Sequence, residues 1–344
     1  MRYRQLGRTQ LAVSEIGFGA WGIGGTSWIG AQDEASLRTL AAARDAGINF
    51  FDTALAYGDG HSERLLARTF GASQEIVIAT KIPPLNRKWP APAEVPLSEA
   101  YPKDHVQGCL THSLRNLGRE CVDLLQYHVW SDEWADEAGW LETIAELRRS
   151  GLVRYVGISI NDHEPENVLR ALDTGLIDCV QVIYNIFDQS PADTLFPYCQ
   201  RHKIGIIARV PFDEGSLAGK IRPETTFPER DFRNYYFSGN RKKQVWERVQ
   251  RLTTDLNVTL EALPDLALRF CLSHAAVSTV IPGMRTPEHV QRNAVISDYG
   301  ALSQETLNRL TQHRWARNFY SPTGTVAGRL IKAVSKVKTL TLGS

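Results

Sequence analysis

The chain has 344 residues, of which 43% are hydrophobic and 22% are charged, and its formal net charge is +1. This length suits one α/β barrel with insertions, and the composition is that of an ordinary globular protein. The near-zero charge excludes a global basic field that would attract nucleic acid, and no run of residues approaches the ~18 apolar residues of a membrane span.

Five widely spaced cysteines without a C-x-x-C pair indicate reduced thiols. The first residues, MRYRQLGRTQ, lack the apolar core of a signal peptide. We therefore expect a cytoplasmic protein with no membrane segment, no nucleic-acid partner and no metal. The sequence carries no signal for an oligomeric state.

Short apolar runs alternate with longer amphipathic stretches. The strand candidates are residues 48–53, 76–81, 122–128, 153–159, 179–183, 204–210 and 277–282. The helical patterns between them are residues 34–46, 103–117, 139–150, 165–174 and 194–202. Such alternation predicts β/α units around a parallel sheet, because each parallel strand needs a crossover helix to return the chain.

Seven strands are clear, and an eighth is hard to place between Phe212 and Leu272. There, residues 230–241 indicate a long polar and aromatic loop, and residues 260–273 a helix. Eight units give the natural closure of a (β/α)8 TIM barrel, and an open doubly wound sheet is the alternative. Residues 3–6 and 11–16 suit a hairpin at the barrel bottom. With no linker visible, we expect one domain over residues 1–344, with residues 313–344 as a C-terminal tail.

Residues 17–22, GFGAWG, match the dinucleotide-binding pattern G-x-G-x-x-G. That reading requires a helix to open at the glycines, so that its N-terminus holds pyrophosphate. Further glycines follow at positions 24 and 25, and no helix can begin until about Asp33. We therefore predict a glycine-rich loop at the barrel mouth, where the backbone can approach a ligand closely.

Four polar residues fall at or beyond the ends of successive strands: Asp52, Tyr57, Lys81 and His128. In a barrel these ends meet at one face, where active sites are built. An ammonium beside a tyrosine is expected to lower its pKa, a carboxylate would hold that ammonium, and a histidine can orient a substrate oxygen. Singly, each residue could be a structural ion pair, cap or packing residue. Together, without a serine–histidine nucleophile or a metal cage, they favour hydride addition to a carbonyl.

The motifs around these residues resemble the aldo-keto reductases. They are FDTAxxYGxGxSE at 51–63, ATK at 79–81, DLLQYH at 123–128, VGISxN at 156–161, QVxYN at 181–185 and IPG at 281–283. The similarity runs from about Tyr3 to Asn293. It implies a barrel that binds NAD(P)H in extended form, with Asp52, Tyr57, Lys81 and His128 as the catalytic tetrad.

The resemblance also implies a cofactor site, with NADPH expected and NADH less so. Ser159, Asn161 and Gln181 match the residues that hold the nicotinamide carboxamide. The remaining cofactor candidates are Gly19, Ala20, Trp21, Asp52, Arg209, Pro211, Phe212, Gly215, Ser216, Lys220, Gly283, Arg285, Thr286, His289 and Asn293. Arg209 stands where the family often has a stacking tyrosine, and His289 where it commonly has glutamine. Backbone donors near Arg285 suit a 2′-phosphate, and the alternative is a surface arginine.

The expected substrate side consists of Trp21, Tyr57, His61, His128 and Trp130, with core packing as the alternative for both tryptophans. In the family the C-terminal region often closes over the substrate, so residues 315–320 could set specificity. Residues 326–338 have the pattern of a basic amphipathic helix, which could contact a membrane or a partner or pack on its own domain.

Three functions follow from these features. The first is an NADPH-dependent reductase of a small aldehyde, ketone or sugar carbonyl. The second is an NAD(P)-linked sugar or alcohol dehydrogenase that uses the same site in the other direction. The third is a cofactor-binding regulatory subunit, of the kind found with potassium channels.

Overall fold

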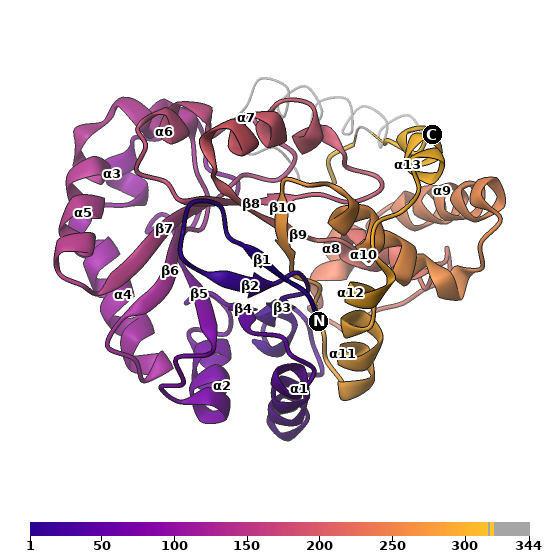
Figure 1. Ribbon diagram of the computed structural model, residues 1–344, viewed down its shortest axis with the longest axis horizontal. Helices are drawn as coiled ribbons and strands as arrows, with labels where there is room; N and C mark the ends of the chain where they lie inside the picture. The colour runs from indigo at the N-terminus through magenta and orange to yellow at the C-terminus, as the bar shows by residue number, and fades with distance from the viewer. Residues whose placement is uncertain (316, 320–344) are drawn as a thin grey trace, which may run out of the picture.

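Eight parallel strands form the central ring of the computed structural model, which describes residues 1–315 and 317–319 (Figure 1). In spatial order they are β3 (Phe18–Gly19), β4 (Phe50–Asp52), β5 (Val77–Ile82), β6 (Val122–Tyr127), β7 (Val153–Ser159), β8 (Cys179–Ile183), β9 (Gly205–Arg209) and β10 (Val277–Val280). Parallel bridges from Ile16 to Val280 and from Gly19 to Gly283 join the two end strands. The predicted (β/α)8 barrel is confirmed, and the doubly wound alternative is wrong.

Helices cover the outer faces of the strands (Figure 1). The longer ones are α1 (Asp33–Asp45), α2 (His61–Phe70), α4 (Lys103–Leu117), α5 (Ala138–Arg149), α7 (Leu195–His202), α9 (Arg241–Leu256), α10 (Leu263–Ser273), α11 (Pro287–Ala294) and α13 (Gln304–Thr311). The shorter ones are α3 (Leu97–Ala100), α6 (Leu169–Asp173), α8 (Phe232–Tyr236) and α12 (Ile296–Tyr299). Helix α4 shows how they pack, since it buries Val106, Leu110 and Leu117 at helical spacing against the strand layer.

The β1–β2 hairpin closes the N-terminal end of the barrel (Figure 1). Strands β1 (Tyr3–Gln5) and β2 (Ala12–Ser14) pair antiparallel, as predicted. Leu6, Leu11 and Val13 pack with inward-facing residues of the barrel strands. A side chain at Gly7 would bring its Cβ within 2.2 Å of the Gly205 backbone nitrogen, so glycine is required where the hairpin touches β9. With this end plugged, a ligand must enter at the other rim.

The eighth strand is not where the sequence suggested it. It is β3, near the start of the chain, whereas the stretch between Phe212 and Leu272 contains α8, α9 and most of α10. The two residues of β3 are too few to show the alternation of apolar and polar residues that marks a strand, and the glycines around them indicated only a loop. The glycine-rich stretch therefore begins as a barrel strand and continues as the 3-10 turn η1 (Ala20–Ile23) before the loop at the barrel mouth.

Two further local predictions were wrong. Residues 230–241 are not loop throughout, because Asp231 caps α8 by accepting a hydrogen bond of 3.0 Å from the Arg233 backbone nitrogen. The helix expected from Pro165 begins only at Leu169, since the preceding residues form turns.

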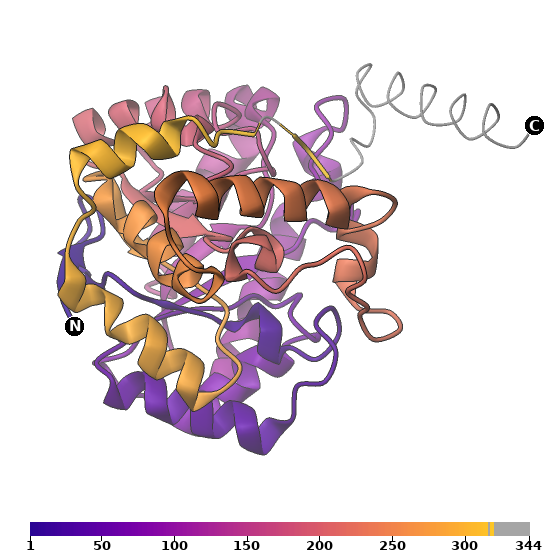
Figure 2. The same cartoon turned by 90° about the vertical axis from the view of Figure 1, so that its right-hand side faces the viewer.

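The end of the described chain lies against the outside of the barrel, with α13 next to α9 (Figure 2). Arg309 and His313 both reach Asp255 near the end of α9, at 3.6 and 3.0 Å. The helical pattern predicted at residues 326–338 lies outside the described residues. Within the described part of the chain, no helix is long and apolar enough to cross a bilayer.

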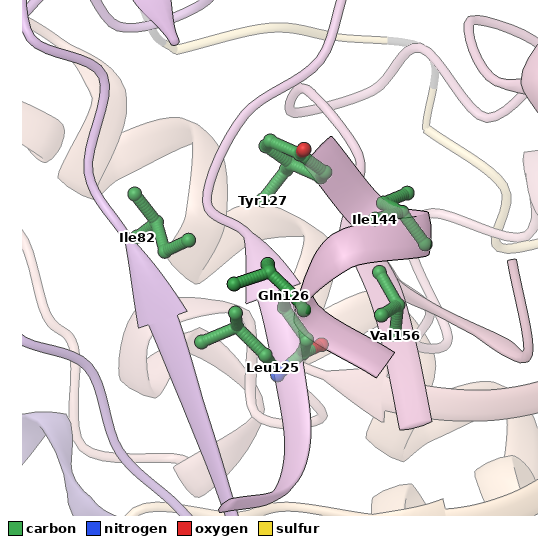
Figure 3. Close-up of a pocket in the computed structure, with 7 residues that line it drawn as sticks. Ile82, Leu125, Gln126, Tyr127, Ile144 and Val156 are labelled. Carbon is green, nitrogen blue, oxygen red and sulfur yellow. The ribbon is translucent and has the colours of Figure 1, made fainter. Parts of the chain in front are cut away.

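A narrow apolar void lies between α5 and the strands β5 to β7 (Figure 3). It is lined by Ile82, Leu125, Gln126, Tyr127, Ile144, Leu147 and Val156. The void has no room for a water molecule and belongs to the layer between strands and helices, so we regard it as a packing gap and not as a ligand site.

Candidate active site

Lys81 brings three of the four predicted catalytic residues together at the open rim. Its Nζ donates hydrogen bonds to Asp52 Oδ1 at 2.5 Å, to the Thr53 carbonyl oxygen at 2.8 Å and to the Tyr57 hydroxyl at 3.2 Å. Asp52 ends β4, Lys81 lies near the end of β5, and Tyr57 lies in the loop between β4 and α2. Lys81 and Asp52 are 1% and 2% exposed, so the ion pair is shielded from solvent.

His128, directly after β6, lies edge-on to Tyr57 with ring centroids 5.6 Å apart. Its Nδ1 is buried and has no hydrogen-bond partner among residues 1–315 and 317–319. Trp89, from the loop after β5, lies against the same imidazole with centroids 4.4 Å apart and an interplanar angle of 88°. Trp89 was not among the residues predicted from the sequence.

Burial controls the protonation of this group. Burial raises the pKa of Tyr57 above its ordinary value. The Lys81 ammonium lowers that pKa, as predicted, but by less than burial raises it, so the net shift is upward. Burial lowers the pKa of Lys81, but Asp52 and Tyr57 raise it by more. Burial, with Lys81 and Arg209 nearby, lowers the pKa of His128 well below its ordinary value. At neutral pH the site therefore holds a neutral phenol, an ammonium and a neutral imidazole.

Two glutamines hold the second oxygen of Asp52. Gln126 Nε2 donates to Asp52 Oδ2 at 3.1 Å, and Gln181 Nε2 donates to it at 2.7 Å. Gln181, expected at the nicotinamide carboxamide, thus has a carboxylate partner inside the barrel. Gln126 was missed, although it lies two residues before His128 and period-two alternation places both on one face of the strand.

Asn161 and Ser159 lie buried at the end of β7. Asn161 Oδ1 accepts a hydrogen bond from the Ala91 backbone nitrogen at 3.0 Å, and its Nδ2 donates to the Ala91 carbonyl oxygen at 3.1 Å. The same Nδ2 donates to Glu164 Oε2 at 3.2 Å. Ser159 pairs with Gln181 in the register of β7 and β8. The structure therefore brings the three carboxamide candidates to adjoining strand ends.

Arg209 is the last residue of β9, and its side chain forms an ion pair. Its guanidinium pairs with Asp162 and donates to the Ile160 carbonyl oxygen at 3.0 Å. These contacts fix the side chain at the rim, close enough to His128 and Tyr57 to affect both pKa values.

The segment after β9 contains four of the residues predicted to bind the cofactor: Pro211, Phe212, Gly215 and Ser216. It turns sharply at Asp213 and Glu214, whose φ angles are +49° and +55°. The Ser216 hydroxyl is fully buried and has no hydrogen-bond partner in the described chain. A buried hydroxyl without a partner is costly, and it fits a segment that receives a polar ligand group.

A cluster of cations, Arg285, Arg233 and Lys220, lies near the start of α11, where Asp231 forms an ion pair with Arg233. Thr286 caps this helix by accepting a hydrogen bond from the His289 backbone nitrogen at 3.3 Å, and Arg285 donates to the Ile29 carbonyl oxygen at 3.1 Å. Burial and then Arg233 lower the pKa of Arg285, while burial and then Lys220 lower that of His289. Like charges that destabilise one another at a helix N-terminus favour a bound anion. Gly283 precedes this cluster, and Asn293 is buried in α11.

Gly19 and Trp21 lie where the glycine-rich segment meets the rim. A Cβ on Gly19 would lie 2.8 Å from the Ile281 carbonyl oxygen, so this close approach requires glycine. The Ala20 carbonyl oxygen accepts a hydrogen bond from Ser62 Oγ at 3.1 Å. The Trp21 ring lies 6.4 Å from that of Tyr57, centroid to centroid. Trp21 therefore borders the catalytic group.

Two of the substrate candidates have other partners. Trp130 is fully buried, with its centroid 5.5 Å from Trp134 and 5.0 Å from Trp140. Its assignment to the substrate wall is therefore wrong, and core packing accounts for it. His61 Nε2 lies 2.9 Å from Asp33 Oδ1, which ties the start of α2 to the start of α1.

The family model for the aldo/keto reductase family matches residues 15–314, which include every strand of the barrel. The chain belongs to this family. Its named relatives include reductases and dehydrogenases, and the names that print a cofactor give NADP(+) or NADH. The match spans the segments that carry the tetrad motifs.

Individual relatives are distant but cover nearly the whole chain. Aldo-keto reductase YhdN of Bacillus subtilis (strain 168) is 28% identical over 311 residues, 89% of this chain and 91% of its own. The holo form of aldo-keto reductase AKR11C1 from Bacillus halodurans superposes with a TM-score of 0.72 at 27% identity, covering 92% of this chain and 97% of its own. The NADH-specific methylglyoxal reductase of Escherichia coli (strain K12) is 26% identical over 314 residues, 85% of this chain and 92% of its own. Family membership alone therefore does not fix the cofactor.

Proposed function

We propose that this protein is an NADPH-dependent reductase of a small aldehyde, ketone or sugar carbonyl, with Tyr57 as the general acid. The observation that carries the proposal is the position of Lys81 Nζ, bonded both to Asp52 and to the Tyr57 hydroxyl. An ammonium held there stabilises negative charge that develops on the phenol oxygen as the proton leaves.

The side chains of this site have distinct tasks. Tyr57 keeps its proton at neutral pH, because burial raises its pKa, and releases it only to a strongly basic oxygen. Neutral His128 donates a hydrogen bond to the carbonyl oxygen and positions it next to Tyr57. Asp52, fixed by Gln126 and Gln181, keeps Lys81 charged and in place. The nicotinamide, when bound, supplies the hydride that adds to the carbonyl carbon.

The described residues fit NADPH. Ser159, Asn161 and Gln181 are assigned to the nicotinamide end. The buried Ser216 hydroxyl suits the pyrophosphate, and the cations around Arg285 suit the 2′-phosphate that distinguishes NADPH from NADH. The cation cluster is thus the reason to favour NADPH in a family whose members differ.

The test is to titrate the purified protein with NADPH and NADH by fluorescence, and then to follow NADPH loss with a panel of aldehydes, ketones and sugars. We expect tighter binding of NADPH and turnover of at least one class of carbonyl. Tight NADPH binding without turnover of any carbonyl, or of any alcohol with NADP+, would instead support a regulatory subunit. Absence of binding by either nucleotide would contradict the proposal.

A further inference from the structure

The loop between β5 and α3, residues 83–96, touches both halves of the candidate site. At Trp89 it covers the imidazole of His128, with ring centroids 4.4 Å apart. Two residues later, at Ala91, it binds the carboxamide of Asn161 through both its backbone N–H and its carbonyl oxygen. Trp89 is 40% exposed, so one part of the ring remains available to a ligand.

The hydrogen-bonding capacity of Asn161 is almost fully used by these contacts. Its Nδ2 has two hydrogens, and these go to the Ala91 carbonyl oxygen and to Glu164 Oε2. Its Oδ1 accepts from the Ala91 nitrogen, which leaves one lone pair. Asn161 is 3% exposed, so no other orientation gives it solvent partners. A second carboxamide can therefore accept from Asn161 only if an existing partner withdraws.

The peptide group of Ala91 offers Asn161 the same donor and acceptor that a nicotinamide carboxamide offers. We propose that Ala91 and the nicotinamide compete for Asn161, and that Trp89, on the same loop, is the movable wall of the carbonyl site. When the cofactor takes Asn161, the loop is released and the Trp89 ring is free to adjust over His128 to the substrate. This inference rests on the proposed function, because it assumes that the nicotinamide binds at Asn161.

The competition can be measured on the unmodified protein by hydrogen–deuterium exchange. NADP+ is compared with 2′-phospho-ADP-ribose, which has the same adenine and phosphate groups but lacks the nicotinamide. We expect faster exchange in the peptide that contains Ala91 with NADP+ and no change with the fragment. Unchanged or slower exchange at Ala91 with NADP+ would overturn the proposal.

A substitution tests the same competition through binding. Ala91→Pro removes the backbone N–H that donates a hydrogen bond to Asn161, at a position already flanked by Pro90 and Pro92. Ala91→Gly keeps both the N–H and the carbonyl group and is the matched control. Ala91 is then held on Asn161 by one hydrogen bond instead of two and withdraws more easily, so NADP+ binding should tighten about fivefold in Ala91→Pro while binding of the fragment stays unaffected. Equal affinity changes for both nucleotides, or none, would show that Ala91 has only a structural role.

The role of Trp89 as a wall of the carbonyl site is tested by measuring KM for aldehydes of increasing size. Trp89→Ala should lower KM for bulky aldehydes relative to small ones, with Trp89→Phe intermediate. Leu85→Ala, at an exposed position of the same loop, is the control and should leave this selectivity unchanged. Identical selectivity in Trp89→Ala and wild type would remove Trp89 from the carbonyl site. Failure of wild type to bind either nucleotide contradicts the proposed function itself, whereas normal binding with no response at residues 89 and 91 contradicts this inference alone.

Discussion

The ammonium of Lys81 lies 2.5 Å from a carboxylate oxygen of Asp52, and the two side chains are only 0% and 3% exposed. Two charges are removed from water at high cost, and each is tolerable only because the other is present. Gln126 and Gln181 satisfy the remaining carboxylate oxygen. These bonds hold the pair next to the Tyr57 hydroxyl, which lies 3.2 Å from Lys81 Nζ.

Breaking this pair on one side should destabilise the protein. Asp52→Asn leaves Lys81 as an uncompensated buried cation, and we expect it to lose about 3 kcal/mol of the free energy of unfolding. Lys81→Met should lose less, because Asp52 keeps its two glutamine donors. The double variant Asp52→Asn/Lys81→Met should recover most of the stability but no activity. Guanidinium chloride unfolding measures these differences; a double variant less stable than Asp52→Asn would contradict this account of the pair.

The pH dependence of carbonyl reduction follows from the two shifted groups. Reduction needs Tyr57 protonated, and burial raises its pKa above the ordinary value of about 10, so activity is lost only as pH rises through that higher value. The lowered pKa of His128 keeps the imidazole neutral, which removes an acid limb near its ordinary value of about 6.5. We expect kcat/KM at saturating NADPH to stay flat from about pH 6 to about pH 9. A decline centred near neutrality would show that a different group titrates.

Arg285 should discriminate between the two nucleotides. Its guanidinium lies half-buried near the start of α11, and a hydrogen bond from a charged group to phosphate is worth about 1.5–3 kcal/mol. Arg285→Ala should therefore weaken NADPH binding at least about tenfold with little effect on NADH. Fluorescence titration of both nucleotides measures this, with Arg292→Ala, inside α11, as the control. Equal losses for NADPH and NADH would refute the phosphate role.

The sequence predicted most of the fold because seven strands have recognisable apolar runs and end near polar residues. Strands β7 and β8 were predicted with the bounds they have, and so was helix α4. Strand β3 was not predicted, because two residues in a glycine-rich segment show no hydrophobic periodicity. The barrel nevertheless closes through this segment, which bridges to the residues of and after β10. Helix α8 escaped because five residues after a cap are too few to show a helical pattern.

The sequence predicted those features of the site that follow from residue type and strand position. It did not predict those that depend on which side chains pack together in the fold. The grouping of Asp52, Tyr57 and Lys81 followed from strand ends converging at one rim. The raised pKa of Tyr57 did not follow, because it depends on how completely the ring is buried. Trp89 gave no signal in a proline-rich loop, and Trp130 could not be separated from core tryptophans before its neighbours were known.

The central claim is that Tyr57 donates the proton, and Tyr57→Phe tests it most directly. This change removes one oxygen and keeps the ring beside His128 and Trp21. The measurement is kcat for reduction of the best aldehyde at saturating NADPH, with NADPH affinity determined on the same preparation. We expect kcat to fall about a thousandfold while NADPH binds as in wild type. Undiminished kcat in Tyr57→Phe would contradict the assignment of the acid.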